Sequence, residues 1–403
     1  MQTASTTTVL RVMNERAVFA EVFRLGQASR PELASVTGLS KPTVAVALAN
    51  LEDAGLLRQV GRRAGPAGRS ALLYEVRPEA GHVLAVDIGR EFVRTALTDL
   101  VGEVVARREE PSRGSRDEDL VAQLTRLADD LADAAGISRG DITLAVFGTP
   151  GVHDEADGSL HLAPNLPGWE RRNSVARLGG ITGATYLVEN DASLAAIGEA
   201  SYGLGRGVPH FVYVLIGTGT GMGVVIDGKL YRGFRGAAGE IGYLPIGDGD
   251  PLLDEPGTHR RGMFESVASA PAVVSSGQRL GVLDIVTAKN VLDAARAGDE
   301  AAVRTLDREV DYLSRALAGV TAVLDPELVV LGGGFGAHAG DLLTGPLLER
   351  LGRLVALDPP RIEVSTLGAE AVLLGAVAVG LTAAHDLVLD RAAPAGIAGL
   401  SKS

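Results

Sequence analysis

The sequence LAVDIGREF at residues 84–92 decides the fold. An apolar run leads into Asp-Ile-Gly, as a buried strand leads into a tight turn. In phosphate-handling folds such a turn is kept small, so that backbone N–H groups can approach a nucleotide. Here Gly89 is followed by Arg90, Glu91 and Phe92, which places a carboxylate and a bulky ring in the turn. The turn therefore raises the question of whether a phosphate still fits there.

Length and composition set broad limits around this turn. The 403 residues are too many for one ordinary core, so we expect two or three domains. The chain is 46% apolar and 22% charged and has no cysteine, which indicates a globular protein without disulfides. The start, MQTASTTTVLR, lacks the apolar core of a signal peptide, and the apolar stretch 371–384 is too short to span a bilayer and is expected to be a buried helix. We expect a cytoplasmic protein that does not contact a membrane.

Charge is unevenly divided along the chain. The formal net charge of −12 is the balance of about +3 in residues 1–80 and −15 in the remainder. Because an acidic body repels a polyanion, any nucleic acid would have to bind the first 80 residues.

Three short helices are predicted in these first 80 residues. Val18, Val22 and Leu25 are spaced for one helix face, and Gly26 follows as a stop signal. Ser29-Arg30-Pro31-Glu32 is a capping-box pattern that opens a second helix, which is expected to turn Leu33 and Val36 inward. A third helix is expected from Ser40, with Val44, Ala47, Leu48 and Leu51 on one face. This is the helix-turn-helix arrangement, and Gly38 permits the left-handed turn between its helices.

Two strand-like runs follow the third helix and flank a loop rich in Gly and Arg, which is typical of a wing. We expect Ser40, Lys41 and Thr43 to enter the major groove of DNA. The wing arginines, Arg62, Arg63 and Arg69, are expected to reach phosphates or a narrow minor groove. The alternative is a three-helix protein-interaction module with a solvated basic loop. A basic wing on an otherwise acidic chain favours DNA binding.

From Gly81 onward, strands, Gly-rich turns and helices alternate, which indicates an α/β fold. The run VLIGTGTGMG (214–223) predicts a strand and a tight turn whose backbone amides face an anion, at Gly217, Gly219 and Gly221. The run LDPELVVLGGGFG (324–336) predicts a buried strand that ends in bare backbone, where a flat ring could lie. Two Ala-rich apolar helices are expected near residues 191–200 and 368–381.

In this order the segments resemble the two-lobed actin-like ATPase (ribonuclease H-like) fold of sugar kinases. The motifs APNLPGW (163–169), VENDASLAAIGE (188–199), GTGTGMG (217–223) and GAAGEIGY (236–243) resemble those of the ROK family of sugar kinases and sugar-responsive repressors. The winged module resembles that of the repressor branch.

The resemblance implies three domains. They are a winged helix-turn-helix over 1–79, a first lobe over 80–200 with the C-terminal part 370–403 packing back on it, and a second lobe over 201–369.

The resemblance also implies a sugar site made of carboxylates and amides. The positions that match hexose-binding residues of the family are Asn165, Asn190, Asp191, Glu240, Tyr243 and Glu265. In the family's kinases the residue matching Asp191 is the base that takes the proton from the attacking hydroxyl. Taken from the residues alone, Asn190 and Asp191 are also suited to cap a helix, and Glu265 to be a surface charge.

Two departures from the family follow from the sequence. The zinc ligands of the family, one His and three Cys, are replaced here by Tyr243, Pro256, Thr258 and Met263, so we expect no metal. The family's sugar-binding His is the residue that Tyr243 replaces, which bears on the choice of sugar.

The second departure is the turn of the opening stretch. The family's kinases have Gly-Thr-Lys where this chain has Arg90-Glu91-Phe92. Glu91 would set a negative charge where the terminal phosphates of ATP lie, although phosphoryl transfer depends on stabilising negative charge there. We therefore expect degenerate phosphate turns at Asp87 and Gly89 and at Gly217, Gly219 and Gly221. No cofactor and no catalytic residue are expected, with Asp191 as a vestigial base.

The sequence thus predicts a transcriptional regulator, most simply a repressor, and not an enzyme. Its expected partners are operator DNA and a sugar or sugar derivative, and the expected assembly is a homodimer or homotetramer. One alternative is an active hexose kinase of this family that carries a DNA-binding module. Another is a DNA-binding regulator that responds to no ligand.

Overall fold

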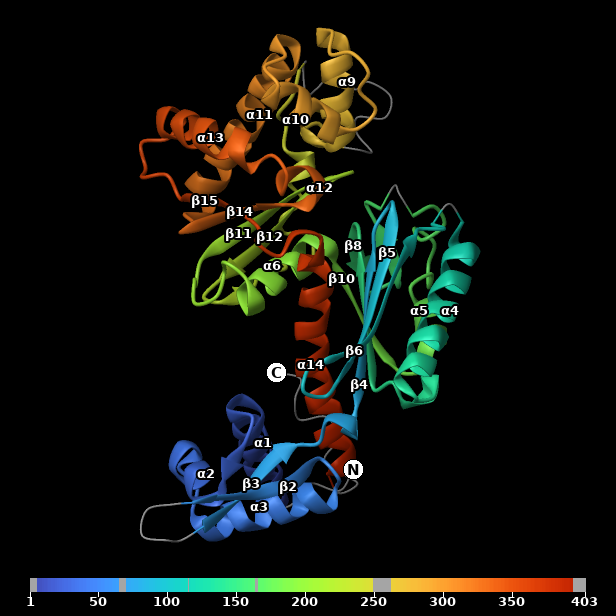
Figure 1. The fold of residues 1–403 in the computed structure, drawn as a ribbon, viewed down its shortest axis with the longest axis vertical. Helices are drawn as coiled ribbons and strands as arrows, with labels where there is room; N and C mark the ends of the chain where they lie inside the picture. Colours follow the sequence, from blue (N-terminus) through green and yellow to red (C-terminus); the bar gives the residue numbers. More distant parts are fainter. Residues whose placement is uncertain (1–5, 65–69, 115, 164–165, 249–261, 394–403) are drawn as a thin grey trace.

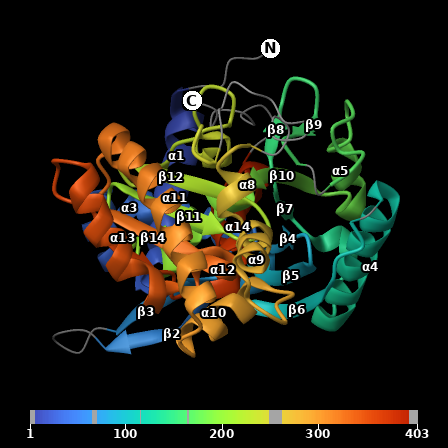
Figure 2. The same cartoon turned by 90° about the horizontal axis from the view of Figure 1, so that it is seen from above.

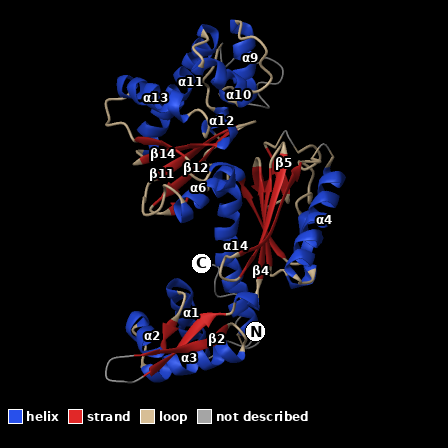
Figure 3. Cartoon of the chain, in the orientation of Figure 1, coloured by secondary structure: helices blue, strands red, loops and turns tan. Residues whose placement is uncertain are grey.

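The computed structural model describes residues 6–64, 70–114, 116–163, 166–248 and 262–393. A small N-terminal module lies at one end of the molecule, and two lobes, each built around a sheet, lie at the other (Figure 1). The helix α14 (Ala371–Ala392) runs from the lobes to the N-terminal module. Figure 3 shows that helices flank each of the two large sheets.

The N-terminal module contains the three predicted helices. They are α1 (Thr6–Leu25), α2 (Arg30–Thr37) and α3 (Lys41–Asp53). The capping box at Ser29 is formed, because Ser29 N–H and its hydroxyl donate to Glu32 at 2.8 and 2.7 Å. Gly38 is left-handed, with φ of 70°, and Ser40 caps α3 by accepting from Thr43 N–H at 3.2 Å. The helix-turn-helix prediction is confirmed.

Two side chains in this module depart from the prediction. Val36 is 47% exposed and Leu25 is 40% exposed, whereas both were expected on buried faces. The helix α2 has only eight residues, and Leu33 is its one fully buried side chain, so its buried stripe is too narrow to include Val36. Leu25 is the last residue of α1, where the chain turns away at Gly26.

The predicted wing is an antiparallel hairpin of β2 (Leu57–Ala64) and β3 (Ser70–Val76), and β1 (Ala28–Ser29) pairs with β3 on its other side. Arg62 and Arg63 lie within β2 and not in the loop at the tip. Arg69 lies outside the described residues.

The first lobe is built on a five-stranded sheet in the order β10-β7-β4-β5-β6. Its strands are β4 (His82–Ile88), β5 (Phe92–Asp99), β6 (Val104–Pro111), β7 (Leu144–Thr149) and β10 (Thr185–Asn190). One face packs on α4 (Asp117–Ala135) and α5 (Ala176–Thr182), and the other on α14. Figure 2 shows α4 on the outer side of this lobe. A short hairpin of β8 (Val152–Asp154) and β9 (Ser159–His161) stands beside the sheet, and the short helices η2 (Pro78–Ala80) and η3 (Arg139–Asp141) lie in its connections.

The second lobe has its own five-stranded sheet, in the order β13-β12-β11-β14-β15. Its strands are β11 (Phe211–Ile216), β12 (Thr220–Ile226), β13 (Lys229–Leu230), β14 (Leu328–Gly332) and β15 (Arg361–Val364). Its helices are α8 (Glu265–Ala268), α9 (Ala270–Leu280), α10 (Ala288–Arg296), α11 (Glu300–Leu324), α12 (Gly333–Gly336) and α13 (Gly340–Leu354), with short η4 (Ile241–Tyr243) and η5 (Gly368–Glu370). The helix α6 (Asp191–Tyr202) follows β10, contacts β11 and β12, and packs along α14.

One hydrophobic core joins the N-terminal module to the first lobe. It includes Val18 and Phe19 of α1, Val83 of β4, and Leu381 and Val388 of α14, all at most 7% exposed. Arg16 donates to Asp390 at 2.7 Å and also to Asp386, which fixes α1 to the end of α14. The module is therefore packed against the first lobe and not hung on a free linker.

The helix α14 is longer than the apolar stretch of residues 371–384. With the preceding turn it spans Gly368–Ala392, a segment that is long and apolar enough to cross a membrane by length and composition. Half of its most apolar stretch of 18 residues is buried inside the structure. Its buried residues pack on α6 and on the first sheet, which is the packing expected of a core helix.

Candidate functional site

Four carboxylates from four elements of the two lobes interact through their charges. Asp87 comes from the end of β4, Asp191 from the start of α6, Glu240 from the start of η4, and Glu265 from the start of α8. The charges of Asp87 and Glu240 both act on Asp191, and that of Glu265 acts on Glu240. The structure thus brings together all three of the predicted sugar-binding carboxylates, Asp191, Glu240 and Glu265, while the predicted amide Asn165 lies outside the described residues.

Asn190 and Asp191 stand where β10 ends and α6 begins. The Oδ1 atom of Asn190 accepts from Ser193 N–H at 3.1 Å and caps α6, and its Nδ2 donates to Gly151 O at 3.1 Å. The carboxylate of Asp191 accepts from the N–H of the next residue, Ala192, at 2.8 Å. Asn190 therefore has a structural role, and its amide holds the strand-to-helix corner that presents Asp191.

Glu240 is positioned by the glycine before it. Gly239 has φ of 93°, and a Cβ atom there would lie 1.8 Å from Met222 O. Only glycine fits so close to β12, and this approach fixes the backbone that leads into Glu240. Tyr243, three residues further on, ends η4 and lies close enough to Glu240 and Glu265 for both charges to raise the pKa of its hydroxyl, after burial.

Glu265 contacts the turn between β11 and β12, the second of the predicted phosphate turns. Its Oε2 accepts from Thr220 N–H at 3.1 Å, and a Cβ atom on Gly219 would lie 3.0 Å from the same oxygen. Gly217 N–H donates to Gly219 O at 2.9 Å, which closes the turn on itself. A carboxylate thus takes a backbone amide in a turn that phosphate-binding folds leave open to an anion.

Burial raises the pKa values of Asp191 and Glu240. Desolvation, followed by the charge of Asp87, raises the pKa of Asp191 to about 7. Desolvation, followed by the charge of Glu265, raises the pKa of Glu240 to about 7. Groups in this range accept or donate protons near neutral pH, and either form can hydrogen-bond a sugar hydroxyl.

Beside the turn between β4 and β5, the first of the predicted phosphate turns, an arginine of β5 lies next to Asp87. Arg94 lies opposite Asp87 in the β4–β5 pair and its Nη1 is 3.3 Å from Asp87 Oδ2. Desolvation raises the pKa of Asp87 to about 6, with Arg94 opposing that rise. The guanidinium of Arg94 also lies 5.7 Å from the centre of the Phe92 ring, whereas Arg90 and Glu91 are exposed. Sequence reasoning missed Arg94, although the alternation of β4 and β5 across a short turn was a signal for it.

The glycines that were predicted to end a buried strand in bare backbone lie where β14 leads into α12. Gly333 has φ of 80°, and its N–H donates to the hydroxyl of Tyr213 at 3.2 Å. A Cβ atom on Gly332 would lie 1.9 Å from the same hydroxyl, so tyrosine packs against bare backbone there.

The candidate DNA surface lies on α3 and the wing. Lys41 is exposed at the start of α3, beside the Ser40 cap and Thr43. Arg63 pairs with Glu32 of α2 at 2.8 Å, and Arg62 donates to the Ser70 hydroxyl at 3.3 Å. The two wing arginines therefore connect the wing to the helix-turn-helix and to the partner strand in the absence of DNA.

Two of the four positions that match zinc ligands, 256 and 258, lie outside the described residues, and the other two are Tyr243 and Met263. In the described part of the chain, one cluster has metal-ligand chemistry: Asp154, Asp157 and His161, with ligand atoms within 4.8 Å of one another. These three belong to the β8–β9 hairpin, where Ser159 and Asp154 also contact His161.

Comparison with known proteins places the chain in a family. Residues 83–382 match the ROK family. The chain is 27% identical over 391 residues to a putative xylose repressor of Caldicellulosiruptor sp., covering 92% of this chain and 96% of that protein. It is 37% identical over 218 residues to a glucokinase of Thermotoga maritima, covering 51% of this chain and 68% of that protein.

Among solved structures, a ROK family transcriptional regulator, a homologue of the E. coli MLC protein, superimposes with a TM-score of 0.78 at 23% identity, over 95% of this chain and 99% of that one. That likeness supports the whole architecture, including the N-terminal module. The predicted family and fold are confirmed, and the chain belongs to the ROK family.

Proposed function

We propose that this protein is a sugar-responsive, DNA-binding transcriptional regulator that does not transfer phosphate. The observation that carries the proposal is the packing of a winged helix-turn-helix onto a ROK lobe through one continuous core. The similarity to a putative xylose repressor over nearly the whole of both chains supports it.

The contacts suggest how a sugar would act on DNA binding. Asp191 stands at the first turn of α6, α6 packs along α14, and the end of α14 holds α1 through Arg16. A sugar that bridges Asp191 of one lobe and Glu240 of the other favours one closure of the lobes. It shifts the equilibrium only by the difference between its affinities for the open and closed states. The change at α14 then alters the placement of the winged module.

The contacts at both phosphate turns argue against phosphoryl transfer. Arg94 pairs with Asp87 beside the turn where the resemblance places the terminal phosphates of ATP, and Glu265 accepts from the amide of Thr220. Both contacts satisfy internally the groups that phosphate transfer would need free.

The test uses the full chain and a DNA sequence selected from a random pool by repeated binding to it. Fluorescence anisotropy then measures release of this DNA by a panel of sugars, with and without Mg-ATP. We expect release by at least one sugar, with no need for ATP and no phosphorylated product. Failure of every sugar to release the DNA would support the ligand-independent regulator instead.

A matched pair of variants tests the site. Asp191→Asn should weaken the response to the active sugar, because a carboxylate accepts hydrogen bonds more strongly than an amide. Asp358→Asn, on the exposed loop between α13 and β15, should not change it. Formation of phosphorylated sugar at ordinary enzyme rates, with a median of about 10 per second, would show that the chain is a kinase.

A further inference from the structure

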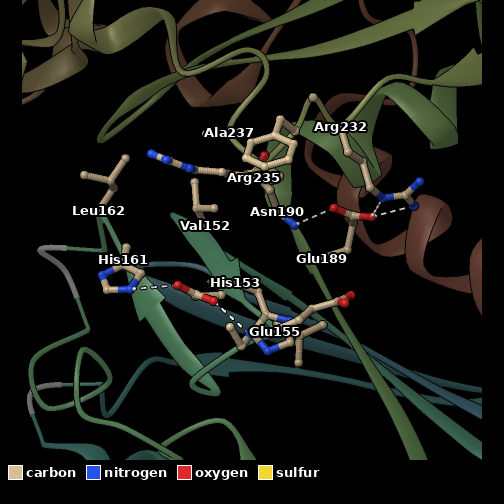
Figure 4. Close-up of a pocket in the computed structure, with 16 residues that line it drawn as sticks. Val152, His153, Glu155, His161, Leu162, Glu189, Asn190, Arg232, Arg235 and Ala237 are labelled. Carbon is tan, nitrogen blue, oxygen red and sulfur yellow. Dashed lines mark hydrogen bonds and ion pairs between the residues drawn. The ribbon is translucent and has the colours of Figure 1, made fainter.

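A cavity of about 840 Å³ opens beside the candidate sugar carboxylates. Its walls are the β8–β9 hairpin, the end of β10 with Asn190, and the loop of residues 232–237 (Figure 4). Asp191, Glu240 and Glu265 are not part of this lining, so the cavity lies outside the carboxylate cluster and adjoins it at Asn190.

The size of the cavity exceeds that of one sugar ring. Pockets that bury a drug-sized ligand have volumes of about 300–1,000 Å³, and this cavity lies in the upper part of that range. A single sugar ring held by the carboxylate cluster would leave nearly all of the cavity empty, because the carboxylates do not line the cavity.

An exposed aromatic ring lines the cavity. Phe234 is 96% exposed, whereas the seven other phenylalanines of the chain are at most 37% exposed. The guanidinium of Arg235 lies 5.8 Å from the centre of the Phe234 ring. A bare aromatic face at a cavity wall is typical of a ligand-binding surface, where it packs against the apolar face of a ligand ring.

Polar side chains that suit hydroxyls also line the cavity. Arg235 carries five N–H donors and has no hydrogen-bond or ion-pair partner within the described ranges. His153 and His161 line the opposite wall, on the β8–β9 hairpin (Figure 4). A small-molecule pocket typically has a few convergent polar groups around an apolar surface.

The charge of the lining does not favour an anion. Arg232 is paired with Glu189 at 2.7 Å, and the lining holds one further arginine, Arg235, together with the carboxylates of Asp154 and Glu155. A phosphate group would meet no net positive charge there.

We propose that the effector is a glycoside of at least two rings. Its first ring binds the carboxylate cluster, and its second ring occupies this cavity and stacks on Phe234, with hydroxyls bonded by Arg235. The inference rests on the proposed sugar-responsive function and specifies the class of sugar.

Isothermal titration calorimetry on the full chain tests it with matched sugars. The pairs are glucose with cellobiose and with maltose, xylose with xylobiose, and N-acetylglucosamine with its β-1,4-linked dimer. We expect at least one disaccharide to bind about tenfold or more tightly than its monosaccharide. Phe234→Ala should reduce that ratio to about threefold or less and leave the monosaccharide Kd unchanged. Leu283→Ala, an 81% exposed apolar side chain outside the cavity, should change neither.

Each other outcome decides between the two proposals. If every monosaccharide binds as tightly as its disaccharide, or if Phe234→Ala weakens both alike, the second-ring site is wrong while the sugar response stands. Tighter binding of glucose 6-phosphate or N-acetylglucosamine 6-phosphate than of every disaccharide would make the cavity an anion site and also overturn the inference. If no sugar binds at all, the proposed function itself fails.

Discussion

Replacing Arg94 by methionine should destabilise the first lobe in a way that depends on pH. The side chains of Asp87 and Arg94 are 7% and 19% exposed, and 3.3 Å separates their closest charged atoms. At an effective dielectric constant of about 20 their attraction is about 5 kcal/mol before desolvation. Breaking a fully buried pair from one side costs about 3–5 kcal/mol. Because Arg94 is partly exposed, we expect a loss of about 2–3 kcal/mol at pH 8.

The sign of the pH dependence follows from Asp87. Its pKa in the folded chain is about 6, above the ordinary value of 3.8, so folding favours the neutral carboxyl. The stability that this neutral form contributes is lost as pH rises through 6 and Asp87 becomes charged. Removing Arg94 raises that pKa further. At pH 5 the carboxyl is mostly neutral and needs no cation, so the loss for Arg94→Met should fall below about 1 kcal/mol.

The single tryptophan makes the measurement local. Trp169 is 2% exposed within the core of the first lobe, so its fluorescence during urea unfolding reports this lobe. Asp87→Asn and the double variant complete a double-mutant cycle. Glu109→Gln, which removes the exposed partner of Arg94, is the control and should cost less than about 1 kcal/mol at both pH values. An equal loss at pH 5 and pH 8, or a coupling energy below about 0.5 kcal/mol, would refute the reasoning.

Further outcomes are expected for DNA, metal and the interface of the winged module. Lys41→Ala and Arg69→Ala should each reduce the slope of log K for DNA binding against log[salt] by about 0.9 per lost phosphate contact. Lys229→Ala is the control and should leave the slope unchanged. Unchanged binding in both variants would contradict the winged-helix interface. Elemental analysis should find no stoichiometric zinc, and a chelator should not shift Tm. One zinc per chain would contradict the prediction that the site lost its metal when residues such as Tyr243 replaced the zinc ligands of the family. Burial lowers the pKa of His385, which packs between Phe19 and Phe23 of α1, so stability should fall as pH drops below about 6.5. Urea unfolding at several pH values should show that His385→Gln reduces this dependence.

Local signals in the sequence predicted the helix-turn-helix well. The capping box at Ser29 and the cap at Ser40 act within three or four residues, so the sequence alone indicates where α2 and α3 begin. The contact of Arg16 with Asp390 joins residues far apart in the chain, and no local pattern indicates it. The same holds for Phe234, because its exposure depends on which segments do not cover it.

The opening turn shows why the site was only partly predictable. From the sequence, the substitution of Arg90, Glu91 and Phe92 explained the loss of a phosphate turn by charge and bulk. In the structure Arg90 and Glu91 are exposed, and the group that meets Asp87 is Arg94. This follows from the register of β4 and β5, which sets Asp87 opposite Arg94. Gly89 N–H donates to Phe92 O and closes the turn. A turn that is longer or shorter by one residue would shift the register and move every side chain of β5 to the other face of the sheet. The tight turn and the arginine therefore act together: the turn fixes the register, and the register places a cation of the protein beside Asp87.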